Sequence, residues 1–223
     1  MPAKNIIKTY LENAYYHLYN RGVNKQIIFK NQQDYGVFLG YLKQYLSPKD
    51  KNSCLRNITI HNKVYKILTP PCNNYYQEIK LLAYCLMPNH FHLLVKQKSE
   101  RGIESFMKSL GTRYTMYFNK RHQRIGPLFQ GRYKAVMVDN ENQLLHLSRY
   151  IHLNSLSRNP TQPSSYSDYL GLNHTVWIHP QEILAYFKTA HKINLNDVNS
   201  YQNFVEDYAK PSETFLENLA LDS

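Results

Sequence analysis

The chain has 223 residues, 43% of them hydrophobic, which is enough for one main domain with a sizeable core. No stretch approaches the roughly 18 consecutive apolar residues of a membrane-spanning helix, and the start of the chain lacks the apolar core of a signal peptide. We therefore expect a cytoplasmic protein without a membrane partner. Its three cysteines form no CxxC pair and fit reduced thiols better than a disulfide framework or a zinc knuckle.

The formal net charge is +11, which creates a positive field that attracts polyanions. Twenty tyrosines add flat faces on which unstacked bases can lie. Most of these tyrosines can equally be packing residues, so the aromatic content supports the charge argument without proving it. Nucleic acid is the leading partner, and association with the nucleoid would follow when the protein binds DNA.

The first half of the chain predicts a strand, a helix and a hairpin. Aromatic residues at 15–22 end in the turn residue Gly22 and predict a strand. Apolar residues recur at helical spacing from 32 to 45, which predicts an amphipathic helix packed on that strand. The polar insertion that follows, about 49–76, contains an alternating run at 57–67 and predicts a small hairpin.

Two near-continuous apolar runs, 80–87 and 91–96, flank a compact turn at 88–89 and predict the two central strands. Ser99 is the expected cap of a helix that reaches about residue 122. The remaining predicted elements are an edge strand at 133–138, a helix from Asp139 or Asn140 to about 153, and short helices at 180–187 and 196–209.

Strands and helices around one sheet define an α+β domain. We expect the catalytic or binding domain at residues 1–155, with the hairpin inserted at about 49–76. Residues 156–223 are more polar and are expected to form a small helical C-terminal appendage.

His90 and His92 are the first candidate site residues. Side chains alternate along a strand, so both imidazoles project from one face and can share a divalent cation. The turn before them places the pair near a sheet end, where a substrate can reach it. Two core histidines with satisfied hydrogen bonds are the alternative interpretation.

A further ligand and a nucleophile are available on the helix near residue 150. At about 100° per residue, Leu144, Leu147 and Ile151 form its buried stripe. Tyr150 and Asn154, one turn apart, lie together on the flank of that stripe. For Tyr150 alone, a packing role is the competing interpretation.

Five short motifs follow one another in the chain: Tyr19-Asn20-Arg21-Gly22, His90-Phe91-His92, Gly126 to Ala135, Arg149 to Asn154, and Ser164-Ser165-Tyr166. Jointly and in this order they resemble the single-tyrosine HUH transposases, and in particular the REP-associated tyrosine transposases of bacteria. The resemblance extends over about residues 15–169.

This resemblance implies a ferredoxin-like antiparallel sheet with the histidine pair on a central strand and helices packed on one face. It implies that His90, His92 and Asn154 are metal ligands and that Tyr150 is the nucleophile. Ser155 departs from the pattern, because this branch has proline at that position. The implied cofactor is Mg²⁺ or Mn²⁺; imidazole ligands suit Mn²⁺ somewhat better.

The implied reaction is metal-dependent nicking and rejoining of single-stranded DNA with hairpin or palindromic ends. Attack by a tyrosine gives a 5′-phosphotyrosyl link and a free 3′-OH, so rejoining needs no nucleoside triphosphate. The resemblance is compatible with a monomer or a homodimer. Candidate phosphate contacts, for each of which a solvated basic face is the alternative, are Asn20, Arg21, Lys25, Arg113, Arg132 and Lys134.

Other functions stay open. The chain can be a domesticated, non-catalytic binder of single-stranded or hairpin DNA, or a metal-dependent phosphodiesterase that uses water. Replication initiators and relaxases share the chemistry, but many have a second tyrosine on the same helix, where this chain has His146. Tyr114 and Tyr117 are rival nucleophiles, although neither has a ligand-type residue four positions later.

Overall fold

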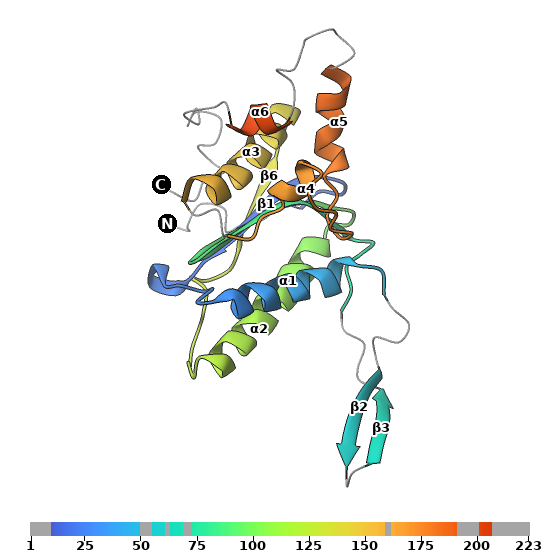
Figure 1. Ribbon diagram of the computed structural model, residues 1–223, viewed down its shortest axis with the longest axis vertical. Coiled ribbons are helices and arrows are strands. Elements are labelled where there is room, and N and C mark those ends of the chain that lie inside the picture. The colour runs from blue at the N-terminus through green and yellow to red at the C-terminus, as the bar shows by residue number, and fades with distance from the viewer. Residues whose placement is uncertain are drawn as a thin grey trace.

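The computed structural model gives the chain an α+β fold, as predicted (Figure 1). A four-stranded antiparallel sheet, with the strand order β4-β5-β1-β6, lies between two layers of helices. Within the described part of the chain, no helix has the length and apolar character needed to cross a membrane. The structure describes residues 10–49, 55–60, 63–68, 73–158, 162–190 and 201–206. The strands of this sheet are β1 (Tyr15–Arg21), β4 (Ile79–Met87), β5 (His90–Gln97) and β6 (Lys134–Val138).

The strand order confirms that the histidine pair lies on a central strand, because β5 pairs with β4 on one side and with β1 on the other. The prediction that β4 is also central is wrong. Instead of a further strand, a C-terminal segment covers the outer edge of β4. Leu86 N donates to Pro163 O (3.0 Å), and Ser165 N donates to Tyr84 O (3.1 Å). These bonds cover an edge that would otherwise expose backbone groups.

Two helices, α1 (Gln32–Leu46) and α2 (Gly102–Arg121), pack on one face of the sheet, as expected. Other helices cover the opposite face, which the prediction of helices on one face did not include. Leu93 points into the core beneath α1 and α2, whereas Leu94 points into a second core beneath α3 (Glu141–Arg158). A strand buried on both faces has a continuous apolar run, which explains the missing alternation after the histidines. The second layer is completed by α4 (Tyr166–Tyr169), α5 (Gln181–Ala190) and α6 (Tyr201–Glu206).

Two helix ends differ from the prediction. Ser99 does not cap α2, because its hydroxyl donates to a carboxylate oxygen of Glu78 (2.6 Å). The last long helix of the predicted catalytic domain, α3, continues past the expected end near residue 153 and reaches Arg158. Ser155 explains the difference, because a proline there would have disrupted the helix by clashing with the preceding turn.

The inserted hairpin is confirmed as β2 (Leu55–Ile60) paired with β3 (Lys63–Leu68), and Figure 1 shows it set apart from the helices. The helix predicted at 196–209 corresponds to α6, and its remaining residues lie outside the described part of the chain. Cys85 is a buried free thiol, whereas the other two cysteines lie outside the described residues.

A buried histidine joins α3 to the C-terminal segment. His152 is fully buried, with its Nδ1 at 2.7 Å from the Tyr201 hydroxyl and its Nε2 at 2.8 Å from the Ser165 hydroxyl. Burial lowers the pKa of His152 from 6.5 to about 3. The segment after residue 155, predicted as an appendage, therefore packs against α3 through a neutral imidazole.

This neutral histidine should make stability depend on pH. Between pH 6.5 and about 3 the unfolded chain binds a proton at His152 that the folded chain rejects. The free energy of unfolding should therefore fall by about 1.4 kcal/mol per pH unit from this residue alone as the pH drops through that window. We expect His152→Gln to lose this contribution, as measured by urea unfolding at pH 7, 6 and 5. Equal pH slopes in the two proteins would contradict the prediction.

Candidate active site

The structure brings the two predicted histidine ligands together at the start of β5. His90 and His92 are buried, and their rings meet edge to face with centroids 4.9 Å apart. Alternation places both on the same face as Leu94, which is the face that α3 covers. In register, His90 lies opposite Arg21 at the end of β1.

Tyr150 on α3 reaches this histidine pair. Its ring meets the ring of His92 edge to face, with centroids 5.4 Å apart, and its hydroxyl oxygen is buried. Asn154 lies one turn further along the helix, and its Nδ2 donates to the carbonyl oxygen of Tyr150 (3.1 Å). This bond uses the amide nitrogen, so the amide oxygen of Asn154 is the atom suited to bind a cation.

The donor set fits a divalent cation. Nδ1 of His90 lies 2.6 Å from the Asn89 amide oxygen, and Nδ1 of His92 lies 2.8 Å from Nε2 of His17. With Nδ1 of both rings engaged, Nε2 is the nitrogen that would coordinate a cation. Among the described residues there is no cluster of three or more His, Cys, Asp or Glu that could hold a metal. Asn154, the predicted third ligand, would supply an amide oxygen, and its role stays a prediction.

His17 is the residue near this site that sequence reasoning missed. It lies on β1 and is wholly buried, with its ring edge to edge with that of His92. The signal available in the sequence was a histidine in an aromatic strand, which by itself does not reveal the contact with another strand.

The predicted phosphate contacts divide between the two faces of the sheet. Alternation places Arg21 and Lys134 on the face of the histidines. Asn20 points to the other face, where its Nδ2 donates to Gly131 O (3.3 Å). Lys25 ends the short 3-10 helix η1 (Val23–Lys25), beyond the end of β1.

Arg113 is not brought to the histidine pair. Its guanidinium donates to Oε1 of Gln44 (2.5 Å) and lies over the ring of Tyr41, at 4.2 Å from the centroid. These contacts join α2 to α1 on the opposite side of the sheet, which is a structural role that the sequence pattern did not reveal.

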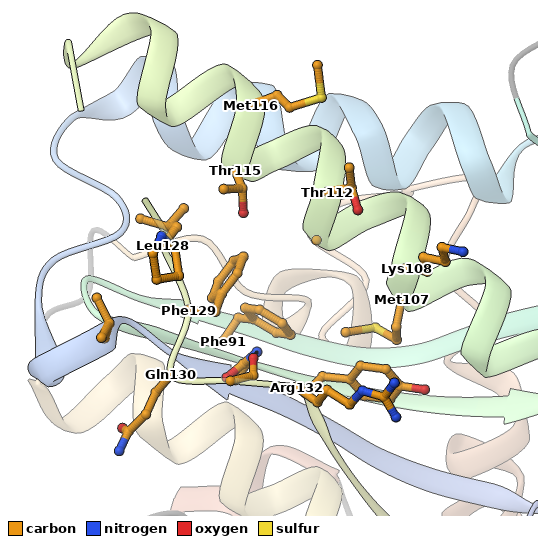
Figure 2. Close-up of a pocket in the computed structure, with 16 residues that line it drawn as sticks. Phe91, Met107, Lys108, Thr112, Thr115, Met116, Leu128, Phe129, Gln130 and Arg132 are labelled. Atoms are coloured by element: carbon orange, nitrogen blue, oxygen red, sulfur yellow. Dashed lines mark hydrogen bonds between the residues drawn. The ribbon is translucent and has the colours of Figure 1, made fainter. Parts of the chain in front are cut away.

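A pocket of about 790 Å³ lies between α2 and the segment 127–133 (Figure 2). Phe91 and Phe129 provide aromatic faces in it, and Lys108 and Arg132 provide cations. Since Phe91 stands between the two histidines on β5, the pocket lies across the sheet from them. Sequence reasoning selected Arg132 and missed the other three, because the pocket joins elements that are distant in sequence.

The two rival nucleophiles lie on the pocket side and have other roles. The Tyr114 hydroxyl donates to Ile28 O (2.6 Å), and the Tyr117 hydroxyl donates to a carboxylate oxygen of Asp34 (2.9 Å). Burial raises the pKa of Tyr114, and burial with the bond to Asp34 raises the pKa of Tyr117 to about 12. Both phenols are thus held in their protonated, packing state.

Comparisons with known proteins agree with this architecture. A REP-associated tyrosine transposase, solved bound to a REP hairpin, has the same fold, with a TM-score of 0.51 and 9% sequence identity. The match covers 78% of this chain and 95% of that one. No curated protein matches the chain.

The family model described as "Transposase IS200 like" matches residues 36–154, which is more than half of the chain. The protein therefore belongs to the IS200-like transposase family. The matched range contains His90, His92, Tyr150 and Asn154.

A glycine fixes the turn beside this site. Gly22 N donates to Asn89 O (2.8 Å), and a Cβ on Gly22 would lie 2.2 Å from the carbonyl oxygen of Gln26. Gly22→Ala should therefore lower the free energy of unfolding by about 1–3 kcal/mol, because the backbone must shift. Chemical denaturation measures this loss.

Gly40→Ala on α1 is the matched control, because a Cβ there meets nothing within 4 Å. It should raise the free energy of unfolding by about 0.5–1 kcal/mol, the usual gain from replacing glycine within a helix. An unchanged free energy of unfolding in Gly22→Ala would contradict the prediction, because it would show that the backbone of this turn can shift without loss of stability.

Proposed function

We propose that this protein nicks and rejoins single-stranded DNA with Tyr150 as the nucleophile. The observation that carries the proposal is the contact between Tyr150 on α3 and His92 on β5, which brings a phenol to a pair of imidazoles from a distant element. Membership of a transposase family supports DNA strand transfer as the reaction.

In this proposal His90, His92 and Asn154 hold a Mg²⁺ or Mn²⁺ ion. When bound, the cation would neutralise charge on the scissile phosphate and polarise it for attack. The imidazole nitrogens and the amide oxygen are neutral donors, so the site keeps the full charge of the cation for the phosphate. The burial of both histidines keeps their rings in one arrangement.

The proposed reaction balances without a nucleotide cofactor. The Tyr150 oxygen loses its proton and bonds to phosphorus, the bond from phosphorus to the 3′-oxygen breaks, and that oxygen takes up a proton. The phosphate then links Tyr150 to the 5′ end. Attack by a 3′-OH reverses these steps and restores the tyrosine.

The proposed substrate is single-stranded DNA with hairpin or palindromic ends. The net charge of +11 favours a polyanion, and Arg21 and Lys134 stand on the face of the histidines. The pocket in Figure 2 offers the half-buried ring of Phe129 to an unstacked base, with Arg132 available for a phosphate. The solved transposase with the same fold was bound to a REP hairpin, which favours this substrate class.

Covalent capture tests the nucleophile. Purified protein incubated with end-labelled single-stranded hairpin DNA and Mn²⁺ should give an adduct that survives a denaturing gel. We expect Tyr150→Phe to abolish this adduct and His90→Ala to reduce its rate by at least about tenfold. Tyr117→Phe is the matched control and should form adduct at the parent rate.

An adduct that survives in Tyr150→Phe would overturn the assignment of the nucleophile. Cleavage without any adduct in the parent protein would instead identify a phosphodiesterase that uses water. DNA binding with neither cleavage nor adduct would identify a non-catalytic binding protein.

Salt dependence tests the phosphate contacts. The logarithm of the binding constant for single-stranded DNA should fall linearly with the logarithm of salt concentration. We expect Lys134→Ala to make this slope shallower by about 0.7, the value for loss of one phosphate contact in a single strand. Lys43→Ala, at an exposed position on α1, should leave the slope unchanged. Equal slopes in the Lys134→Ala and parent proteins would exclude the contact.

A further inference from the structure

A third histidine contacts His92, one of the proposed metal ligands, from the neighbouring strand. Nε2 of His17 on β1 lies 2.8 Å from Nδ1 of His92 on β5, and the two rings lie edge to edge, with centroids 5.0 Å apart and planes at an angle of 17°. In register His17 faces Leu94, so the contact is a diagonal one between paired strands.

Packing fixes the ring of His17 in this position. His17 and His92 are each 0% exposed. The ring of Tyr19 lies beside both imidazoles, with its centroid 4.8 Å from that of His17 and 6.1 Å from that of His92. The three packed rings leave little room for rotation. Nε2 of His17 and Nδ1 of His92 are therefore the two atoms that stay within hydrogen-bond distance.

The hydrogen bond has a consequence for coordination, because a neutral imidazole has one N–H donor and one lone-pair acceptor. If Nδ1 of His92 donates to Nε2 of His17, the proton of His92 is on Nδ1 and its Nε2 carries the lone pair. If His17 donates instead, the proton of a neutral His92 is on Nε2, where it blocks coordination. Only the first arrangement makes His92 a ligand through Nε2.

We propose that His17 is a positioning residue that accepts a hydrogen bond from Nδ1 of His92 and so holds Nε2 of His92 ready for a divalent cation. Hydrogen-bond partners of this kind fix the tautomer and orientation of metal-binding histidines. Asn89 stands in the same relation to His90, since its amide oxygen lies 2.6 Å from Nδ1 of His90. The inference rests on the proposed function, because it takes His92 as a metal ligand.

Two substitutions at residue 17 separate hydrogen bonding from packing. His17→Phe keeps a planar ring of similar size but removes the acceptor. His17→Gln keeps an acceptor, because its amide oxygen can reach the position that Nε2 of histidine occupies. His17→Asn is the matched control for the glutamine, since it has the same amide group on a side chain too short to reach His92.

The main measurement is Mn²⁺ affinity of the full chain without DNA, obtained by calorimetric titration. We expect Mn²⁺ to bind about 10–100-fold more weakly to His17→Phe and His17→Asn, the usual loss when such a partner of a ligand is removed. His17→Gln should stay within a few-fold of the parent. Thermal unfolding without metal checks that each variant is folded, and the glutamine–asparagine pair tests the inference even if the phenylalanine variant does not fold.

Two further readouts report on His92 itself. Nitrogen-15 NMR should find the proton of His92 on Nδ1 in the parent and in His17→Gln, and a mixture of tautomers in His17→Asn. In adduct formation, His17→Asn should raise the Mn²⁺ concentration that gives half the maximal rate while leaving the rate at saturating Mn²⁺ close to that of the parent. A merely structural role would change stability without moving the tautomer.

His90→Ala distinguishes failure of this inference from failure of the proposed function. If His90→Ala weakens Mn²⁺ binding while His17→Asn binds Mn²⁺ like the parent, the role of His17 alone is overturned. If His90→Ala also binds Mn²⁺ like the parent, the ligand assignment is wrong, and the inference falls with it.

Discussion

Burial of β5 on both faces is the constraint on which the rest of the structure depends. Leu93 belongs to the core under α1 and α2, and Leu94 belongs to the core under α3. This strand therefore needs a layer of helices on each face of the sheet. Because side chains alternate along β5, the sequence of the strand decides which residues contact each layer. The histidines share the face of Leu94, so α3 is the helix that can bring a nucleophile to them.

The same alternation separates two kinds of chemistry across one sheet. The histidine face carries imidazoles, Tyr150 and the cations of Arg21 and Lys134, which suits a reacting phosphate. The opposite face has the pocket that Phe129, Lys108 and Arg132 line.

The segment after α3 contributes to the rigidity of this arrangement. Its backbone bonds cover the outer edge of β4, and the bonds of His152 to Ser165 and Tyr201 hold α3 against the sheet. Tyr150 lies on that helix, so the C-terminal segment helps to position the proposed nucleophile. A division of the chain at residue 155 therefore separates parts that pack together, and it stays a prediction.

The sequence by itself determined the elements and much of the candidate site. Alternation on a strand and the helical period were enough to pair His90 with His92 and Tyr150 with Asn154, because both periods are properties of the local backbone. Tertiary structure alone decided that β4 is an edge strand, that Arg113 joins two helices and that His17 touches His92. These facts depend on contacts between elements far apart in the chain, and no local period encodes which strand or helix becomes the neighbour.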